Sequence, residues 1–599
     1  MNEINEILLE DIKKINLSAE ERYIIENSKD NKKILKINKD GKFVYLGSKY
    51  TVERDIEKFN TNINKINTNS IIMVWGYGTG EHIIDLLKKS SSSNKILVIE
   101  PDEKILIENL LCNNLDIILN DDRVFLFSYK KENLKQFLSE NVNQLEINNV
   151  ELVTYANYDK IYGKEYKEFC ESFFEFVNNT SIELITSLHF SKQFFTCFMN
   201  NIKTIVNSIT INKLKNQFDG RPAIIVSAGP SLEKNICFLR EVQEQFIIIT
   251  GGRTLKALLD EGITPDFVCT VDPGEASYTV IKEVLHSKVP LVFSEVSNYK
   301  IVNEYSGEKI FFKDMDFADI TDDLLGIEVD ILKQGGSVAH VCISLAGYLG
   351  CDKIILIGQD LAYTNNKYHA ESAKNNEQNS ISVDEKYLYV DDIYGEKVPT
   401  TMILDFYRKN IERMVVANEH ITFINSTEGG ANIEGTLVMP LGESIQKYSY
   451  KEGIDKDIEY ILNSDSQVNK QTVIKNIIKI LKSISSIEDI CKKAIVYTSR
   501  MYKHYDKNSI VDINNVITCL DKLDYKLEKE LIKVKSIKKL YIPLVARVMV
   551  SEEFKERIDE NGKQKGKRVA LKSESMYKGL LEIVKEAKIE LKKVEENLI

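Results

Sequence analysis

The chain has 599 residues, too many for one hydrophobic core, and its 43% hydrophobic and 28% charged residues are typical of a soluble globular protein. A formal net charge of −11 argues against nucleic acid or an anionic membrane as the main partner. No run approaches the roughly 18 apolar residues of a membrane span, and the start carries no basic, apolar leader. We therefore expect a cytoplasmic protein without membrane contact.

Residues 1–155 are predicted to form a small Rossmann-like α/β domain. A buried strand at 71–75 runs into the loop Gly76-Tyr77-Gly78-Thr79-Gly80, and a second strand at 95–99 ends at Glu100. A glycine loop followed one strand later by a carboxylate can hold an adenosine ribose, as in methyltransferases. The alternative is a domain kept for packing or acceptor contact, and this is the one that we expect.

The rest of the chain divides by its periodicity. Residues 156–217 are aromatic-rich and mostly helical in period, which indicates a helical linker. Residues 218–440 alternate short apolar strands with helices, the pattern of a larger, Rossmann-like central α/β domain. Residues 441–599 have few glycines and prolines and recurrent apolar residues at helical spacing, so we predict an all-α C-terminal domain with a basic loop at 563–568.

Three strand ends of the central domain are closed by small or polar residues. Ser227 to Leu232 follow the first strand, Gly251 to Arg253 the second, and Asp272 and Pro273 the third. Small residues let the backbone approach a ligand, and free N–H groups at a helix start form an anion site. A nucleotide or phosphate crevice is one interpretation of this edge, and ordinary strand-to-helix turns are the other.

A later strand end carries the residue types of an active site. Gly358-Gln359-Asp360 end a buried strand, and Tyr363, Tyr368 and His369 follow in a loop rich in asparagine. After another strand, Asp314-Met315-Asp316 forms a D-x-D motif, which binds a divalent metal in many nucleotide-sugar transferases. The triplet is common by chance, so a polar strand end is the interpretation that we prefer.

Together these motifs resemble the Maf (motility-associated factor) flagellin glycosyltransferases, and their spacing is similar to that of bacterial sialyltransferases that use CMP-sialic acid. The resemblance continues through Val338-Ala339-His340 to Glu428-Gly429-Gly430-Ala431. It implies a CMP-activated nonulosonic acid (pseudaminic or legionaminic type) as donor, Ser or Thr of flagellin as acceptor, an inverting displacement, and no cofactor or metal. The residues that it implies in donor binding are Ser227, Gly229, Pro230, Ser231, Gly251, Gly252, Arg253, Asp272, Pro273, Gly358, Gln359, Glu428 and Gly429.

The resemblance also implies how the leaving group is stabilised. In the similar sialyltransferases, two tyrosines donate hydrogen bonds to the leaving phosphate and replace a metal, and Tyr363 and Tyr368 match them. A phenol O–H aimed at developing negative charge stabilises the transition state. The chain departs from these enzymes at Ala228 and Asp272, where they carry asparagine.

The general base is less clearly implied. The segment in which the sialyltransferases carry their histidine reads Val398-Pro399-Thr400-Thr401-Met402 here, without a histidine. His369 is the expected substitute, Asp405 or Glu371 are alternatives, and Asp360 completes the catalytic residues that we expect.

Two other functions stay open. The first is a 6-hydroxymethylpterin diphosphokinase of archaeal type, whose family shares the central fold and which would depend on ATP and Mg²⁺. The second is a non-catalytic flagellin-binding module, which predicts a central domain that binds no nucleotide.

Overall fold

The computed structural model describes residues 5, 8, 23–39, 41–63, 70–109, 113–364, 367–373, 387–456, 458, 461, 468–507, 512–554 and 560–599. The chain forms two compact units, and five helices contribute residues to both. Unit 1 comprises Met1–His189, Thr498–Ile513 and Pro543–Met576, and unit 2 comprises Phe190–Tyr497, Asn514–Ile542 and Tyr577–Ile599. The helices that the two units share are α8 (Gly163–Val206), α18 (Lys470–Lys507), α19 (Ile513–Lys533), of which only Ile513 belongs to unit 1, α20 (Lys535–Val550) and α21 (Gly562–Leu598).

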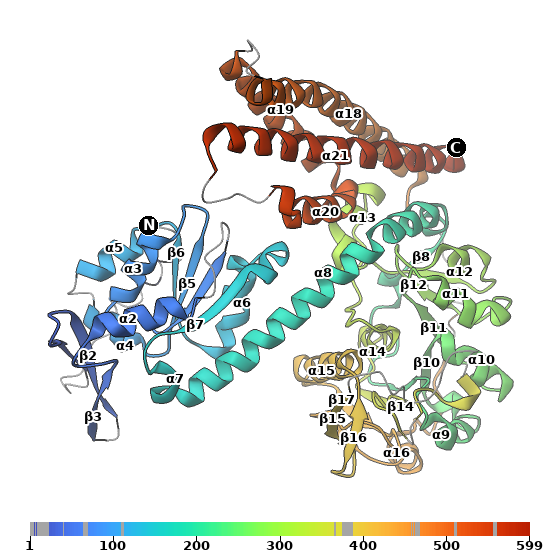
Figure 1. Ribbon diagram of the computed structural model, residues 1–599. Coiled ribbons are helices and arrows are strands. Elements are labelled where there is room, and N and C mark those ends of the chain that lie inside the picture. Colours follow the sequence, from blue (N-terminus) through green and yellow to red (C-terminus); the bar gives the residue numbers. More distant parts are fainter. Residues whose placement is uncertain are drawn as a thin grey trace. The chain divides into compact units, whose positions relative to one another are not determined.

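A four-stranded parallel sheet organises unit 1 (Figure 1). The strand order β6-β5-β4-β7 means that the chain moves outward from β4 and then returns to its other side with β7. All five residues of β4 are buried, as expected for a parallel strand covered on both faces. The strands are β4 (Ile71–Trp75), β5 (Lys95–Glu100), β6 (Val124–Ser128) and β7 (Val150–Thr154).

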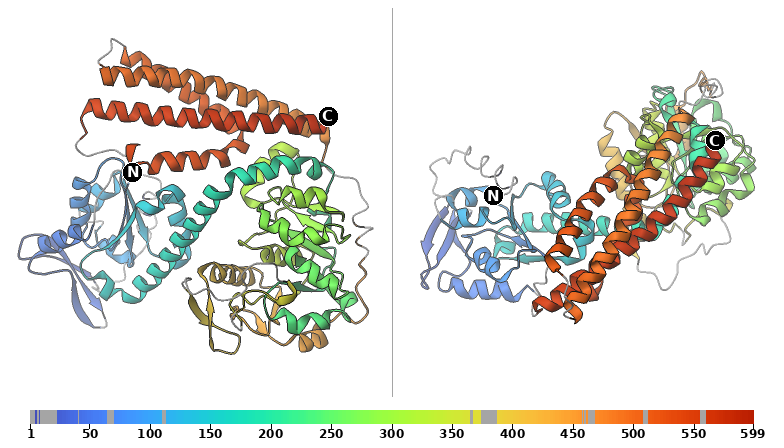
Figure 2. Two further views of the ribbon diagram at one scale, coloured as in Figure 1. Left: turned by 45° about the vertical axis from the view of Figure 1, so that its right-hand side comes forward. Right: turned by 90° about the horizontal axis from the view of Figure 1, so that it is seen from above.

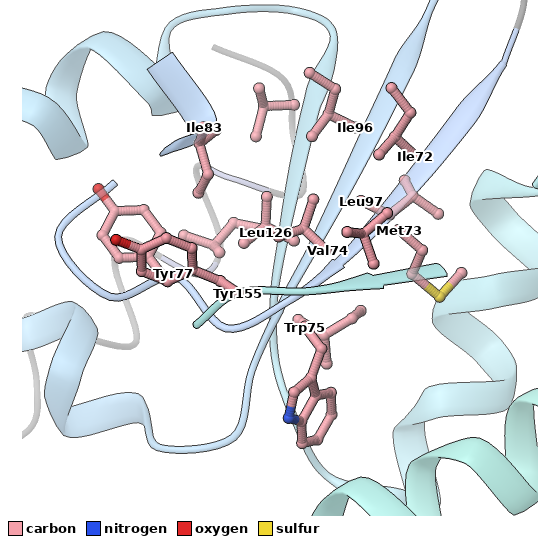
Figure 3. Packing of buried hydrophobic residues seen from close by; sticks show 14 of the residues in the cluster. Ile72, Met73, Val74, Trp75, Tyr77, Ile83, Ile96, Leu97, Leu126 and Tyr155 are labelled. Atoms are coloured by element: carbon pink, nitrogen blue, oxygen red, sulfur yellow. The ribbon is translucent and has the colours of Figure 1, made fainter. Parts of the chain in front are cut away.

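Apolar side chains on both faces of this sheet form the core of unit 1. Figure 3 shows Ile72, Val74 and Ile96 among the packed side chains, with Trp75 directed away from them. The Trp75 ring stacks on Phe169 of α8, with ring centroids 4.8 Å apart. The aromatic residues expected in a helical linker therefore partly belong to this core.

Shorter elements complete unit 1. An antiparallel sheet of order β1-β2-β3 precedes the parallel one. Its strands and the helices of this part of the chain are β1 (Tyr23–Asn27), β2 (Lys33–Lys39), β3 (Lys42–Leu46), α2 (Val52–Thr61), α3 (Glu81–Lys89), α4 (Glu103–Asn109), α5 (Asn113–Leu119), α6 (Lys131–Asn141) and α7 (Tyr158–Ile161).

A nine-stranded sheet organises unit 2, and all its neighbouring strands are parallel. In the order β18-β17-β14-β9-β10-β11-β12-β13-β8, the chain leaves β9 in one direction and later returns to its other side with β14. The carboxyl ends of β9 and β14 therefore mark the point where ligands bind in open α/β sheets. The strands are β8 (Ile209–Thr210), β9 (Pro222–Val226), β10 (Ile247–Gly251), β11 (Phe267–Thr270), β12 (Leu291–Phe293), β13 (Lys309–Phe311), β14 (Lys353–Ile357), β17 (Thr422–Asn425) and β18 (Leu437–Val438).

Helices cover both faces of this sheet, which confirms the Rossmann-like α/β class expected from the sequence. Figure 1 shows α9 to α12 along one side of the strands and α14 on the other. The hairpin of β15 (Leu388–Asp391) and β16 (Lys397–Thr400) forms a separate two-stranded sheet. The helices are α9 (Leu232–Leu239), α10 (Gly252–Asp260), α11 (Glu275–Ile281), α12 (Tyr299–Glu304), α13 (Ala318–Leu325), α14 (Val338–Tyr348), α15 (Met402–Ala417) and α16 (Leu441–Tyr448).

Two amide side chains of α8, eight residues apart, hold the loops that follow β11 and β12. Gln193 Nε2 donates to the carbonyl oxygen of Pro273 at 2.8 Å. Asn201 Nδ2 donates to the carbonyl oxygens of Glu295 and Ser297 at 3.0 and 2.7 Å. The second half of α8 therefore fixes two loops at the carboxyl edge of the sheet.

The C-terminal part is helical, as predicted, and its orange-to-red helices run alongside one another in every view (Figures 1 and 2). α19 spans Ile513–Lys533. The basic loop predicted at 563–568 is wrong, because these residues lie in the first turns of α21. Asn561 and Gln564 form reciprocal side-chain-to-backbone hydrogen bonds of 2.9 and 3.0 Å, a capping box that starts this helix.

No helix in the described ranges is both long enough and apolar enough to cross a bilayer.

Candidate active site

The loops that follow β9 and β14 interlock at the carboxyl edge of the unit 2 sheet. The N–H of Gly229 donates to the carbonyl oxygen of Gly358 at 2.7 Å, and the Ser227 hydroxyl donates to Gln359 Oε1. A Cβ on Gly229 would lie 2.2 Å from the Asp360 carboxylate, and one on Gly358 would lie 2.1 Å from the carbonyl oxygen of Ser227. Only glycine permits this approach, so both glycines expected in the donor site have a structural reason.

Asp360 ties three loops together. Its buried carboxylate accepts hydrogen bonds from the Ser231 hydroxyl and the Thr364 hydroxyl, both at 2.6 Å, and from the Ser231 N–H at 3.2 Å. Its carbonyl oxygen accepts the N–H of Ala431 at 2.7 Å. Burial raises the pKa of this carboxyl, and the hydrogen bonds oppose that effect. Asp360 is 2% exposed, so we assign it a positioning role in place of the catalytic role expected from the sequence.

The Asp360 carboxylate also changes the role expected of the start of α9, the helix that follows β9. α9 begins at Leu232, after Pro230 rather than at it, and the Ser231 side chain makes no capping bond to the helix. The Ser231 hydroxyl and N–H both bond to Asp360. The anion site expected at this helix start is therefore occupied by the protein's own carboxylate.

Two other helix starts meet at the same edge. α10 begins at Gly252 and α14 at Val338. A Cβ on Gly251 would lie 2.7 Å from Val338, so the two N-termini are neighbours. Arg253 is half-buried in the first turn of α10. Paired helix N-termini beside a guanidinium favour an anion.

The structure brings the predicted tyrosines together. The Tyr363 and Tyr368 ring centroids are 5.4 Å apart, and Tyr363 also contacts Tyr387 at 5.3 Å. The His369 ring lies 4.4 Å from that of Tyr368. Tyr363 is 7% exposed and its N–H donates to the carbonyl oxygen of Pro399 at 2.9 Å, whereas Tyr368 and His369 are half-buried. The tyrosines therefore form one aromatic cluster after β14.

Sequence reasoning missed the residue that holds this loop. Leu361 has a φ of +51°, which a leucine rarely adopts. The hydroxyl of the buried Thr400 donates to the carbonyl oxygen of Leu361 at 2.7 Å. Such backbone strain concentrates at functional loops, where the surrounding structure must hold it. Thr400 carries no motif that would have revealed this contact.

The two alternative bases are already paired. Asp405 makes ion pairs with Arg408 at 2.7 Å and with Lys409 at 3.1 Å. Glu371 makes an ion pair with Lys367 at 3.1 Å. Both carboxylates therefore already have cationic partners within the protein.

Asp272, directly after β11, differs from these carboxylates. Its carbonyl oxygen accepts the N–H of Asn298 at 3.0 Å and the hydroxyl of Ser277 at 3.1 Å. Asp272 is exposed and its carboxylate has no hydrogen-bond or ion-pair partner in the described part of the chain, and desolvation by nearby protein atoms raises its pKa. Tyr407 of α15, missed by sequence reasoning, has its pKa raised to about 12 by burial and then by Asp272 and Tyr368.

Asp314 of the D-x-D motif contacts a buried polar network. Glu295, which is 0% exposed, accepts the N–H of Asp314 at 2.9 Å and the hydroxyl of Thr321. Burial, reinforced by the charge of Asp314, raises the Glu295 pKa to about 8. Gln334 donates to the Asp314 carboxylate at 2.6 Å, and the Asp316 side chain lies outside the described set. Among the described residues, no group of three or more His, Cys, Asp or Glu side chains could hold a metal.

The loop after β17 completes the edge. A Cβ on Gly429 would lie 2.6 Å from Thr364, and one on Gly430 would lie 2.3 Å from the carbonyl oxygen of Asp360. Glu428 is half-buried beside them. This loop therefore packs on the loop that follows β14.

The glycine loop of unit 1 is filled by the protein itself. A Cβ on Gly76 would lie 2.5 Å from the Tyr158 ring. The Tyr158 hydroxyl accepts the N–H of Gly78 at 2.8 Å and donates to Glu100 at 2.9 Å. Tyr158 and Glu100 are both 0% exposed, and burial raises the Glu100 pKa to about 8. Tyr158 thus takes the hydrogen bonds of Gly78 and Glu100 that a ribose would need. This supports the interpretation that the domain is kept for packing.

Gly76→Ala should therefore lower the free energy of unfolding of unit 1 by about 2–4 kcal/mol, through ring overlap and a φ of +101°. The control is Gly41→Ala, with a φ of +79° and nothing within 4 Å, which should cost only about 1–2 kcal/mol. The single tryptophan, Trp75, lies in this core, so its fluorescence during urea unfolding reports the effect. Equal losses in both variants would show that Tyr158 can leave the loop.

The chain resembles known proteins in sequence over part of its length. The pattern of the family described as 6-hydroxymethylpterin diphosphokinase MptE-like matches residues 196–366. A 6-hydroxymethyl-7,8-dihydropterin pyrophosphokinase of Methanocaldococcus jannaschii is 38% identical over 80 residues, 13% of this chain and 33% of that protein. An uncharacterized protein of Treponema pallidum is 32% identical over 91 residues, 15% of this chain and 42% of that protein. The chain thus spans less than half the length of these curated relatives.

The structural comparison covers the whole chain. The structure of a Maf glycosyltransferase from Magnetospirillum magneticum superposes with a TM-score of 0.62, covering 100% of this chain and 95% of that one. At 16% identity this likeness shows a shared fold. The likeness to Maf proteins that the sequence motifs indicated is confirmed at this level.

Proposed function

We propose that this protein is a glycosyltransferase that moves a nonulosonic acid, of pseudaminic or legionaminic type, from its CMP-activated form to Ser or Thr of flagellin. The fold shared with a Maf glycosyltransferase supports glycosyl transfer. The observation that carries the proposal is the pair of tyrosine rings, Tyr363 and Tyr368, 5.4 Å apart in the loop after β14, the strand that pairs with β9 where the chain changes direction across the sheet.

The charges of the crevice suit a CMP-sugar. The neighbouring starts of α10 and α14, with Arg253, would receive the phosphate, because their N–H groups and the guanidinium favour negative charge. The two tyrosine hydroxyls would stabilise the charge that grows on this phosphate as the sugar leaves. A single displacement at the anomeric carbon then inverts its configuration, and the proposal needs no metal.

A pterin diphosphokinase is the second candidate, because the MptE-like pattern and the 38% identical segment favour it. The matched region ends at residue 366, before Tyr368 and before the loop of Glu428. The tyrosine pair and the whole-chain structural likeness therefore favour glycosyl transfer.

Nucleotide binding distinguishes the candidates. CMP at about 100 times its Kd should stabilise the folded protein by about 2.7 kcal/mol, while ATP with Mg²⁺ and S-adenosylmethionine should leave the melting temperature unchanged. CMP release from the donor in the presence of flagellin should persist in EDTA. Stabilisation by ATP and Mg²⁺ alone would favour the diphosphokinase, and a protein that binds neither nucleotide would be a binding module.

A further inference from the structure

Strand β16 holds the loop that carries Tyr363. The N–H of Tyr363 donates to the carbonyl oxygen of Pro399 at 2.9 Å, and the hydroxyl of the next residue, Thr400, donates to the carbonyl oxygen of Leu361 at 2.7 Å. Pro399 and Thr400 are the last two residues of β16. Two adjacent residues of one strand therefore fix the backbone from Leu361 to Tyr363.

The other side of Tyr363 is fixed as well. The hydroxyl of Thr364 donates to the Asp360 carboxylate at 2.6 Å. The Tyr363 ring is 7% exposed, and its centroid lies 5.4 Å from that of Tyr368 and 5.3 Å from that of Tyr387. Because the ring is packed and its backbone is bound on both sides, the direction of its hydroxyl depends on these few hydrogen bonds.

The hydrogen bond to Leu361 is the one that opposes a strained conformation. Leu361 has a φ of +51°, whereas the other described non-glycine residues with a positive φ are two asparagines and an alanine. A left-handed leucine costs a free energy similar to that which one neutral hydrogen bond contributes. Thr400 is 0% exposed, so bulk water does not take its place at the carbonyl oxygen. Loss of this one hydroxyl would therefore let the loop relax.

We propose that Thr400 is a positioning residue, which holds Tyr363 where its hydroxyl meets the leaving phosphate. This inference rests on the proposed function. Because Thr400 is fully buried, it acts on the reaction only through the loop. A donor already aimed at the developing charge needs no rearrangement during the reaction, whereas a misplacement of about 1 Å can cost about 10²-fold in rate. Thr400 thus contributes to turnover and not to donor affinity.

Turnover in a double-mutant cycle tests this role. Thr400→Val keeps the shape of the side chain and removes the hydroxyl, so CMP release with flagellin and saturating donor should fall by about 10- to 100-fold, with an unchanged KM for the CMP-sugar. In Tyr363→Phe the positioned hydroxyl is already absent, so adding Thr400→Val should lower turnover by less than about twofold more. Thr400→Ser keeps the hydroxyl and should retain most of the turnover.

Thr436→Val is the matched control, because the Thr436 hydroxyl also donates to a carbonyl oxygen at 2.7 Å, that of Ile433 before β18. It should turn over normally. If Thr400→Val does not fold, Thr400→Ala compared with Thr400→Ser removes the same donor. Normal turnover in Thr400→Val overturns the inference. A loss that multiplies fully with that of Tyr363→Phe also overturns it, because Thr400 would then act independently of the tyrosine.

A second measurement separates this inference from the proposed function. With 3-fluorotyrosine at position 363, the fluorine resonance of the full-length chain should shift or split in Thr400→Val and stay unchanged in Thr436→Val. A resonance unchanged in both variants overturns the hold of Thr400 on Tyr363. Wild-type protein that releases no CMP overturns the proposed function, while the resonance still decides whether Thr400 fixes the tyrosine.

Discussion

Gly358→Ala is expected to destabilise unit 2 by about 3 kcal/mol or more and to abolish nucleotide binding. The added Cβ would lie 2.1 Å from the Ser227 carbonyl oxygen at a φ of +63°. The neighbouring backbone cannot yield, because the hydrogen bond between Gly229 and Gly358 joins the two loops at 2.7 Å. Urea unfolding followed by far-ultraviolet circular dichroism, together with CMP titration, measures both effects.

The matched control is Gly395→Ala in the β15–β16 turn, with a φ of +88° and nothing within 4 Å. Gly395→Ala should lower the free energy of unfolding by about 1–2 kcal/mol, because alanine disfavours a left-handed backbone conformation, but its Cβ would meet no neighbouring atom. Similar stabilities of the two variants would mean that the β9 and β14 loops separate easily, which contradicts the interlocked site.

Removing both hydroxyls of the tyrosine pair should lower turnover by about 10²-fold or more. A hydrogen bond to a charged group is worth roughly 1.5–3 kcal/mol, which corresponds to about 10- to 150-fold for each of Tyr363→Phe and Tyr368→Phe. The rings remain and hold the cluster, so the melting temperature should change little. CMP release at saturating donor is the measurement.

Tyr389→Phe serves as control, because this tyrosine of β15 is 66% exposed. Wild-type turnover in both single variants would make the cluster a packing feature and remove the leaving-group role. A large drop in melting temperature would instead show that a hydroxyl supports the fold.

The helices and strands could be predicted from the sequence more fully than the hydrogen bonds between residues that lie far apart in it. The strands Ile71–Trp75 and Lys353–Ile357 could be predicted because their signals, a short apolar run closed by small or polar residues, are local in the sequence. The partner of Asp360 is Ser231, 129 residues away, and no local pattern shows such a contact. The capping box of Asn561 and Gln564 was a local signal, and it overrode the glycine at 562 that suggested a loop.

The glycine loop of unit 1 illustrates the same limit. The strand, loop and carboxylate were all predicted, and all are present. Whether they hold a ligand depends on Tyr158, which reaches Glu100 from 58 positions further along the chain. A sequence motif therefore predicts the backbone conformation of a loop more reliably than it predicts whether the loop binds a ligand.

The two amide side chains of α8 bind two loops, so the number of residues between them must stay constant. Gln193 and Asn201 bind different loops. One residue inserted or deleted between them would rotate one side chain by about 100° about the helix axis relative to the other. Substitutions on the exposed face of this segment should be tolerated, whereas insertions and deletions should not. Natural or engineered variants of this protein should therefore keep the number of residues between Gln193 and Asn201, and should vary at exposed positions such as Asn200 rather than at buried ones such as Phe198.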